Sequence, residues 1–419
     1  MIDMIDNPGS VYIVDEMMGV GKSSAAINYI NSSESDDRFI VITPYLDEVE
    51  RYKNNCSKKH FKEPIKKRGS KLVDIKTLIR KGENIVCTHA LFQRFDDEII
   101  SMCRSLGYTM IMDEVAEVVR ECNISEDDIR LLLNENCYIT EDGLLKWRDE
   151  CQSYQGEFSE IKNLCNLGAI SIVRNKALLW LFPVEVFKSF KRIFILTYLF
   201  HSQLQCYYYD YYHVKYSYLH VTGTSPENYC FSENKDIYAA YDYKKLINIL
   251  DNYRLNVVGD NTYALSSSWY KNYDKTAIMK QLANNISNFF RHIRNDNTKD
   301  NLWTCFEDFR GQLQGKGYTR GFIPLNLRAT NEYRERTSLA YMVNIFLNPM
   351  IKGFFQDHGV TVDEDGYALS EMLQWIWRSA IRDGKEIWVY IPSRRMRELL
   401  SSWIEEVSPA INKEETPQQ

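Results

Sequence analysis

Residues 10–24, SVYIVDEMMGVGKSS, carry the strongest structural signal in the sequence. They begin with a run of β-forming residues, continue through a loop that contains glycines, and lead into the helical stretch AAINYI. A helix that starts at such a loop presents free N–H groups and the positive end of its dipole to an anion. The order strand, loop, helix is therefore typical of a phosphate-binding loop.

The loop follows the Walker A pattern G-x-x-x-x-G-K-[ST] with one departure, because Glu16 stands at the first glycine position. Gly19 and Gly21 remain, so the backbone can still aim its N–H groups at phosphate oxygens. In such a loop Lys22 contacts the β- and γ-phosphates, and the hydroxyl of Ser23 ligates Mg²⁺. The sequence therefore predicts a site for a nucleoside triphosphate with magnesium.

The chain has 419 residues, of which 44% are hydrophobic, and this fits one very large domain or two ordinary ones. No apolar run approaches the ~20 residues that a membrane span needs, and residues 1–10 lack the segments of a signal peptide. The ten cysteines are scattered without a C-x-x-C pair, which favours reduced thiols in a cytoplasmic protein. Because the net charge is −6, nucleic acid would have to bind through local basic patches.

An apolar run at 108–115, YTMIMDEV, contains two adjacent acids, Asp113 and Glu114. Carboxylates at the end of a buried strand suit a Walker B site, in which Asp113 holds Mg²⁺ and Glu114 orients the attacking water. Such a pair is a weak signal alone, and its place downstream of a phosphate loop strengthens it.

Further apolar runs alternate with helical patterns, and this predicts a doubly wound parallel sheet with ligands at the carboxyl ends of its strands. Residues 116–190 are predicted to be mostly helical, and 205–221 to be strands with a connector. The other strand ends that we expect at the same cleft are Thr43, Thr88 and Thr197. The second half is predicted to have strands at 255–259, 301–306, 321–325 and 386–392, and helices at 275–294, 334–347 and 369–382.

The predicted helix at 369–382 carries Gln374, Arg378 and Arg382 at intervals of four, which places them on one helix face. A solvated basic face is the ordinary interpretation. The functional interpretation is a pair of arginines that stabilise charge on the γ-phosphate, a task that suits the planar guanidinium.

Two other polar segments are candidate contacts for nucleic acid. Residues 58–71 contain seven Lys or Arg, and they are either a solvated loop or a phosphate-contacting edge. The turn within 320–337 follows an apolar run and is rich in Asn, Arg and Thr. It is either a ligand contact or only an N-capped turn that starts a helix.

These motifs together resemble those of superfamily 2 helicases, and are most similar to compact helicase-like proteins of bacteriophages and related mobile elements. Motif I is matched by MMGVGKSS, motif Ia by VITP and motif II by MDEV. The pair Thr88-His89 resembles the strand-contacting motif that follows motif Ia, and ILTYLF resembles motif III. FIPLNLRATNEY stands where motif V belongs. QWIWRSAIR resembles motif VI (QxxGRxxR), with Trp377 in place of glycine and Arg382 one residue beyond the usual second arginine.

The resemblance implies an α/β fold of two tandem RecA-like doubly wound domains, at 1–222 and 223–408, with an interdomain ATP cleft and a flexible tail at 409–419. ATP and Mg²⁺ are the implied cofactors. The implied nucleotide-binding residues are Gly19, Gly21, Lys22, Ser23, Ser24 and Asp113, of which Ser23 and Asp113 hold the metal. The implied catalytic residues are Glu114, Gln374, Arg378 and Arg382. The implied nucleic-acid contacts are Thr43, Pro44, Thr88, His89, Asn326, Arg328, Thr330 and Asn331.

The function that this resemblance implies is an ATP-hydrolysing helicase or translocase on single-stranded or partly duplex DNA, in phage or plasmid DNA replication. Its partners would be single-stranded nucleic acid, DNA more than RNA, and replication or phage proteins, with no membrane. The protein would be located in the cytoplasm, which would be the host cell's cytoplasm if a phage encodes the protein. Two alternatives share the motifs: a nucleic-acid-stimulated ATPase that remodels protein–DNA complexes without unwinding, and a P-loop nucleotide switch or kinase with an unrelated C-terminal binding module.

Overall fold

A computed structural model describes residues 9–44, 46–67, 69–234, 241–325 and 332–408. The chain divides into two compact units, and it passes between them three times. The first unit comprises residues 1–236 together with 347–363, and the second comprises 237–346 together with 364–419. Each unit is described separately below.

The first unit is built on an eight-stranded sheet, in which the seven strands from β12 to β3 run parallel and β13 pairs antiparallel at one edge. In spatial order the strands are β13 (Cys230–Ser232), β12 (Tyr216–Thr222), β1 (Ser10–Asp15), β11 (Arg192–Thr197), β5 (Thr109–Asp113), β2 (Phe39–Thr43), β4 (Asn84–Thr88) and β3 (Phe61–Lys62).

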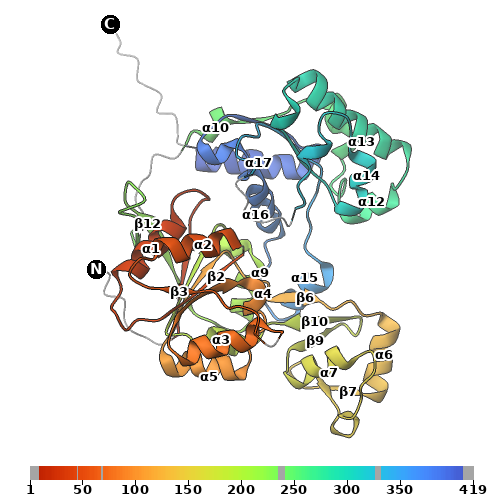
Figure 1. Ribbon diagram of the computed structural model, residues 1–419. Helices are drawn as coiled ribbons and strands as arrows, with labels where there is room; N and C mark the ends of the chain where they lie inside the picture. The colour runs from red at the N-terminus through yellow and green to blue at the C-terminus, as the bar shows by residue number, and fades with distance from the viewer. Residues whose placement is uncertain (1–8, 45, 68, 235–240, 326–331, 409–419) are drawn as a thin grey trace, which may run out of the picture. The chain divides into compact units, whose positions relative to one another are not determined.

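Helices cover both faces of this sheet, which explains why its central strands are apolar along their whole length. All five residues of β2 are buried, as are the first four of β5. In Figure 1 the helices on one face are α1 (Lys22–Ser32) and α2 (Leu46–Asn55), and those on the other are α3 (Lys71–Arg80) and α5 (Asp97–Leu106). The expectation of a doubly wound parallel sheet is confirmed.

The segment between β5 and β11 differs from the mostly helical structure that we predict for it. It contains the three-stranded antiparallel sheet β6-β10-β9, a hairpin and two helices that Figure 1 shows beside it. Runs such as ISIV and ALLWL are short and mostly apolar, and periodicity alone does not separate them from buried helix. The elements are β6 (Val119–Glu121), α6 (Glu126–Glu135), β7 (Cys137–Ile139), β8 (Leu145–Trp147), α7 (Ser159–Asn166), β9 (Ile170–Val173) and β10 (Ala177–Leu181).

One segment from the second half of the sequence belongs to the first unit. It contains α15 (Pro349–Asp357), which packs against β6, β9 and α9 (Leu204–Tyr211). Arg174 forms a bidentate ion pair with Asp357, with N–O distances of 3.1 and 3.0 Å. The hydroxyl of Ser202 donates to the carboxylate of Asp363 at 2.8 Å. The helix α9 also corrects the prediction of strands with a connector at 205–221, because only β12 within that range is a strand.

The second unit contains a four-stranded, all-parallel sheet in the order β14-β17-β16-β15. The strands are β14 (Ile247–Ile249), β17 (Ile387–Tyr390), β16 (Ser338–Tyr341) and β15 (Asn301–Thr304). The helices that Figure 1 labels in this unit are α10 (Tyr243–Leu246), α12 (Ser267–Asn272), α13 (Ala277–Asn288), α14 (Arg310–Leu313), α16 (Glu364–Ile376) and α17 (Arg394–Val407).

Three predictions for the second unit are wrong, and each concerns an apolar run. The predicted strand at 321–325 is not a strand, because Gly321 ends a 3₁₀ turn and Phe322 forms only an isolated bridge with Trp303. The predicted strand at 255–259 is instead α11 (Tyr253–Asn256) followed by a 3₁₀ turn, because the side chain of Asn252 caps the helix by accepting from Leu255 N. The predicted helix at 334–347 contains β16, whose four residues are all buried. Among the described residues, no helix is long and apolar enough to cross a membrane.

Candidate nucleotide-binding site

The phosphate loop lies between β1 and α1, as predicted, and its glycines have the backbone that the motif needs. Gly19 and Gly21 have φ values of 89° and 94°, which side-chain-bearing residues rarely adopt. A Cβ atom on Gly21 would lie 2.3 Å from the ring of Tyr229, so glycine is also required there by space. Gly21 is the N-cap residue of α1, and the helix N-terminus therefore faces the loop.

The ammonium group of Lys22 is held inside the loop. It donates hydrogen bonds to the carbonyl oxygens of Glu16 and Met17, the latter at 3.0 Å. Burial lowers the pKa of Lys22 to about 8, and the nearby carboxylates, Asp113 foremost, oppose that shift. An ammonium group held among backbone carbonyls in this way is placed to move onto phosphate oxygens.

The hydroxyl of Ser23 donates to Oδ2 of Asp113 at 3.1 Å. This contact joins residues that are 90 positions apart, at the start of α1 and the end of β5. A hydroxyl and a carboxylate oxygen at this separation are hard oxygen donors of the kind that Mg²⁺ takes in phosphoryl-transfer sites. The residues present therefore fit the metal that the motif implies.

The pKa of Asp113 is raised to about 7 at this site. Burial is the largest cause, and the charges of Glu48 and Glu114 add to it. The hydrogen bond from Ser23 and the charge of Lys22 act in the opposite direction. A divalent cation would relieve this repulsion, so the electrostatics favour metal binding.

Glu114 follows Asp113 in a left-handed conformation, with φ of 66°, which is uncommon for a residue with a side chain. Its N–H donates to Leu196 O at 3.0 Å, which ties it to the neighbouring strand β11. The backbone thus turns sharply at Glu114, as at sites where strain serves function.

The two residues that start the loop are held from either side, and sequence reasoning did not identify these contacts. The carboxylate of Asp15 accepts from Leu199 N at 2.7 Å and from Phe200 N at 3.0 Å, just after β11. Oε1 of Glu16 lies 2.7 Å from Nδ1 of His220 on β12, and both side chains are mostly buried. The acids were visible in the sequence, but His220 is 204 positions away and carries no local signal.

A second contact that sequence reasoning missed involves Ser24, which we predict to bind nucleotide. Its hydroxyl accepts from Nη2 of Arg51 at 3.1 Å, and Nη1 of the same guanidinium pairs with Glu48 at 3.3 Å. Arg51 lies on α2, which packs on the same face of the sheet as α1 (Figure 1). It places a cation beside the first turn of α1.

The predicted nucleic-acid contacts in the first unit lie at or directly after strand ends. Thr43 and Thr88 end β2 and β4, and Pro44 follows directly. Thr43 is fully buried, so contact with a ligand would require exposure of its side chain. Nε2 of His89 lies 3.0 Å from Asp113 O, and since a carbonyl only accepts, this nitrogen is the donor. His89 therefore positions Asp113.

The second unit contains the predicted arginines, but not on one helix face. The helix α16 ends at Ile376, so Gln374 lies on it, whereas Arg378 follows it and Arg382 lies in a 3₁₀ turn at 380–383. The guanidinium of Arg378 donates to Pro324 O at 3.4 Å and to Leu325 O at 3.3 Å, and the residue is 6% exposed. The predicted contacts Asn326, Arg328, Thr330 and Asn331 lie outside the described residues.

The basic segment 58–71 is partly paired. Lys67 contacts Asp74 at 2.6 Å, Lys71 contacts Glu63 at 2.9 Å, and the ammonium of Lys59 donates to a backbone carbonyl. Lys58, Lys62 and Lys66 in the same segment are exposed.

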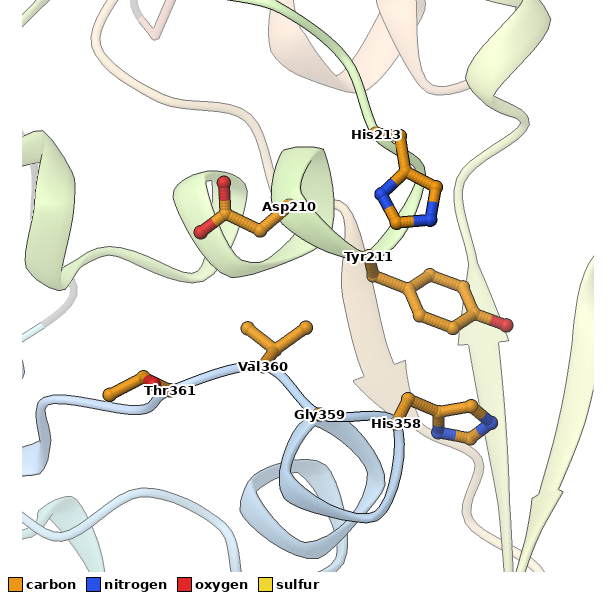
Figure 2. Close-up of a pocket in the computed structure, with 7 residues that line it drawn as sticks. All are labelled: Asp210, Tyr211, His213, His358, Gly359, Val360 and Thr361. Atoms are coloured by element: carbon orange, nitrogen blue, oxygen red, sulfur yellow. The ribbon is translucent and has the colours of Figure 1, made fainter.

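A separate pocket of about 490 Å³ lies in the first unit, between the end of α9 and the residues that follow α15 (Figure 2). Its wall includes the ring of His213 and the rings of Tyr211 and His358, whose centroids are 5.1 Å apart. No residue of the phosphate loop lines it, so it is distinct from the nucleotide site.

Comparison with known proteins gives matches over most of the chain. Residues 119–180 match the YonV middle domain, and residues 241–404 match the YonV C-terminal Rossmann-like domain. The SPbeta prophage-derived protein YonV of Bacillus subtilis strain 168 is 38% identical over 416 residues, which cover 94% of this chain and 98% of that protein.

Among solved structures, one titled XPD_APO covers 94% of this chain and 95% of its own, with a TM-score of 0.50 and 11% identity. The structure of S. tokodaii Xpd4 covers 94% of each chain with a TM-score of 0.49 and 11% identity. The resemblance to superfamily 2 helicases with two RecA-like domains is confirmed at the level of the fold.

Proposed function

The chain belongs to the YonV family, and on that premise we propose that it is an ATP-driven motor on single-stranded nucleic acid. The observation that carries the proposal is the arrangement of Lys22, Ser23 and Asp113 around the phosphate loop of a helicase-like fold. A loop that only resembled Walker A by chance would not join its serine to a strand-end carboxylate.

Each residue has a specific task in this proposal. Lys22 exchanges its loop carbonyls for the β- and γ-phosphates, and Ser23 and Asp113 hold Mg²⁺. The metal supplies charge neutralisation at the phosphates. Glu114 orients and deprotonates the attacking water. Asp15 and Glu16 keep the loop in place through the contacts described above.

The second unit contributes the charge that stabilises the transition state. Arg378 and Arg382 are the two candidates, and Gln374 lies near them in sequence. Conformational changes driven by ATP binding and hydrolysis would move the protein along the bound strand. Thr88 and the exposed lysines of 58–71 are our candidate backbone contacts.

DNA is the substrate that we favour over RNA, and replication of phage DNA in the cytoplasm of the host is the role that we propose. The prophage origin of the relative supports that context. ATP hydrolysis should rise with single-stranded DNA, and a labelled strand should be displaced from a partial duplex. Stimulation without displacement would support remodelling of protein–DNA complexes instead. A rate of ATP hydrolysis that neither DNA nor RNA changes would refute the proposed motor and support a nucleotide switch.

A further inference from the structure

Three side chains in the second unit form a ladder that ends in an exposed tyrosine. The ring centroids of Tyr263 and Phe346 are 5.5 Å apart with 36° between the ring planes. The guanidinium carbon of Arg395 lies 4.3 Å from the centroid of Phe346. Tyr263 is 65% exposed, whereas the side chain of Arg395 is 12% exposed. We call these three residues the Tyr263 ladder.

The ladder stands at the carboxyl edge of the parallel sheet, where ligands of such sheets bind. Phe346 follows the end of β16, and Arg395 follows the end of β17. The loop that carries Tyr263 is packed against the same edge, since a Cβ atom on Gly259 would lie 2.0 Å from Pro392 O.

The inner end of the ladder is fixed by several hydrogen bonds. Arg395 donates to Oδ1 of Asn344 at 2.9 Å and to Ile345 O at 2.7 Å, and it pairs with Asp365 at 2.6 Å. A guanidinium that is held by so many acceptors cannot swing away from the ring of Phe346. The cation and the ring therefore form a rigid support.

The outer end is fixed through the backbone on both sides of Tyr263. Nδ2 of Asn344 donates to Thr262 O at 2.8 Å and to Ala264 O at 2.9 Å. The same asparagine accepts from Arg395, so one side chain connects both ends of the ladder. Tyr263 thus presents its ring in a position that needs little further ordering when a ligand binds.

We propose that Tyr263 is a stacking platform for an unpaired base of the single-stranded nucleic acid, a role that rests on the proposed function. Single exposed aromatics are common on protein surfaces and need no explanation. Tyr263 differs because it packs against the ring of Phe346, which the guanidinium of Arg395 holds in turn, while most of its surface faces solvent. A flat, sequence-independent π-surface is what a motor needs to hold successive bases without reading them.

The proposal separates stacking from backbone binding, and the experiment uses that difference. The Kd of the full-length Tyr263→Ala variant is measured by fluorescence anisotropy for oligo-dT and for an abasic oligonucleotide of the same length. We expect oligo-dT to bind about 5-fold or more weakly than to wild type, because stacking on one aromatic contributes about 1 kcal/mol or more. Binding of the abasic oligonucleotide should change by less than twofold. Tyr263→Trp should restore binding of oligo-dT.

Tyr253 is the matched control, since it is 76% exposed in the same unit and has no ring partner among the described residues. Tyr253→Ala should bind both oligonucleotides as wild type does. Equal weakening of both oligonucleotides by Tyr263→Ala, or none, would overturn the stacking role. If wild type binds neither oligonucleotide, the proposed function itself fails. If oligo-dT binding is unchanged but a replication protein no longer associates, Tyr263 is a protein contact instead.

Discussion

Replacement of Asp113 by asparagine should stabilise the protein while it removes a metal ligand. In the folded chain the pKa of this carboxyl is raised from 3.8 to about 7 by burial and by Glu48 and Glu114. In the absence of metal, ionisation of Asp113 is therefore less favourable in the folded chain than in the unfolded chain, and this difference destabilises the folded state. Asparagine keeps the oxygen that accepts from Ser23 and removes the charge.

The sign and size of the difference in unfolding free energy between wild type and Asp113→Asn follow from proton linkage. Below about pH 4 the carboxyl is protonated in both states, whereas between about pH 4 and 7 only the unfolded chain releases its proton. The folded state of wild type therefore loses stability as the pH rises through that window, and the loss is complete above about pH 7. At 1.36 kcal/mol per pKa unit, the advantage of Asp113→Asn grows from about 2 kcal/mol at pH 5 to about 4 kcal/mol at pH 8 as upper limits.

The assay is urea unfolding without metal at pH 5 and at pH 8, for wild type, Asp113→Asn and the surface control Asp251→Asn. The control should follow wild type at both values. Added Mg²⁺ with ATP should raise the unfolding midpoint of wild type much more than that of Asp113→Asn, because binding to the folded state stabilises it. A variant that is less stable than wild type at pH 8, or a difference that does not change with pH, would refute the electrostatic description of the site.

Three further changes test the roles of single residues. Glu114→Gln should keep ATP binding, measured with a fluorescent analogue, but lower the hydrolysis rate by about 100-fold or more; near-normal turnover would remove Glu114 from catalysis. His220→Ala leaves the mostly buried carboxylate of Glu16 without its imidazole, so the unfolding free energy should fall by about 1–3 kcal/mol and ATP should bind more weakly, whereas an unchanged ATP affinity would show that the pair does not hold the loop. Arg378→Ala and Arg382→Ala should differ in hydrolysis rate at saturating ATP, and the variant that lacks the arginine at the γ-phosphate should be slower by about 1,000-fold; if neither variant slows hydrolysis, neither arginine reaches the phosphates.

The sequence predicted the parts of the site whose geometry is local. Gly21, Lys22 and Ser23 form one turn between a strand and a helix, and Asp113 ends an apolar run, so short patterns were sufficient. The pairing of Glu16 with His220 was not predictable, because it depends on which strand lies beside β1. The arginines were placed on one helix because the pattern of the segment continues past Ile376, where the helix ends.

Short apolar runs were the main source of error in the fold. The buried strands at 170–173 and 177–181 and the strand at 338–341 have no alternation to reveal them, since both faces of each are covered. Conversely, LNVVG has the composition of a strand, yet the cap at Asn252 makes its start helical. Local composition was overridden in each case by a neighbour that is distant in sequence or by a single capping side chain.

The central claim is that the Lys22 loop hydrolyses ATP in response to single-stranded nucleic acid. It is tested most directly by the ATP hydrolysis rate of wild type and of Lys22→Ala, each measured with and without single-stranded DNA and Mg²⁺. The motor predicts a rate in wild type that rises severalfold or more with DNA, and no measurable hydrolysis in Lys22→Ala under either condition. Equal rates in the two proteins, or a wild-type rate that DNA does not change, would contradict it.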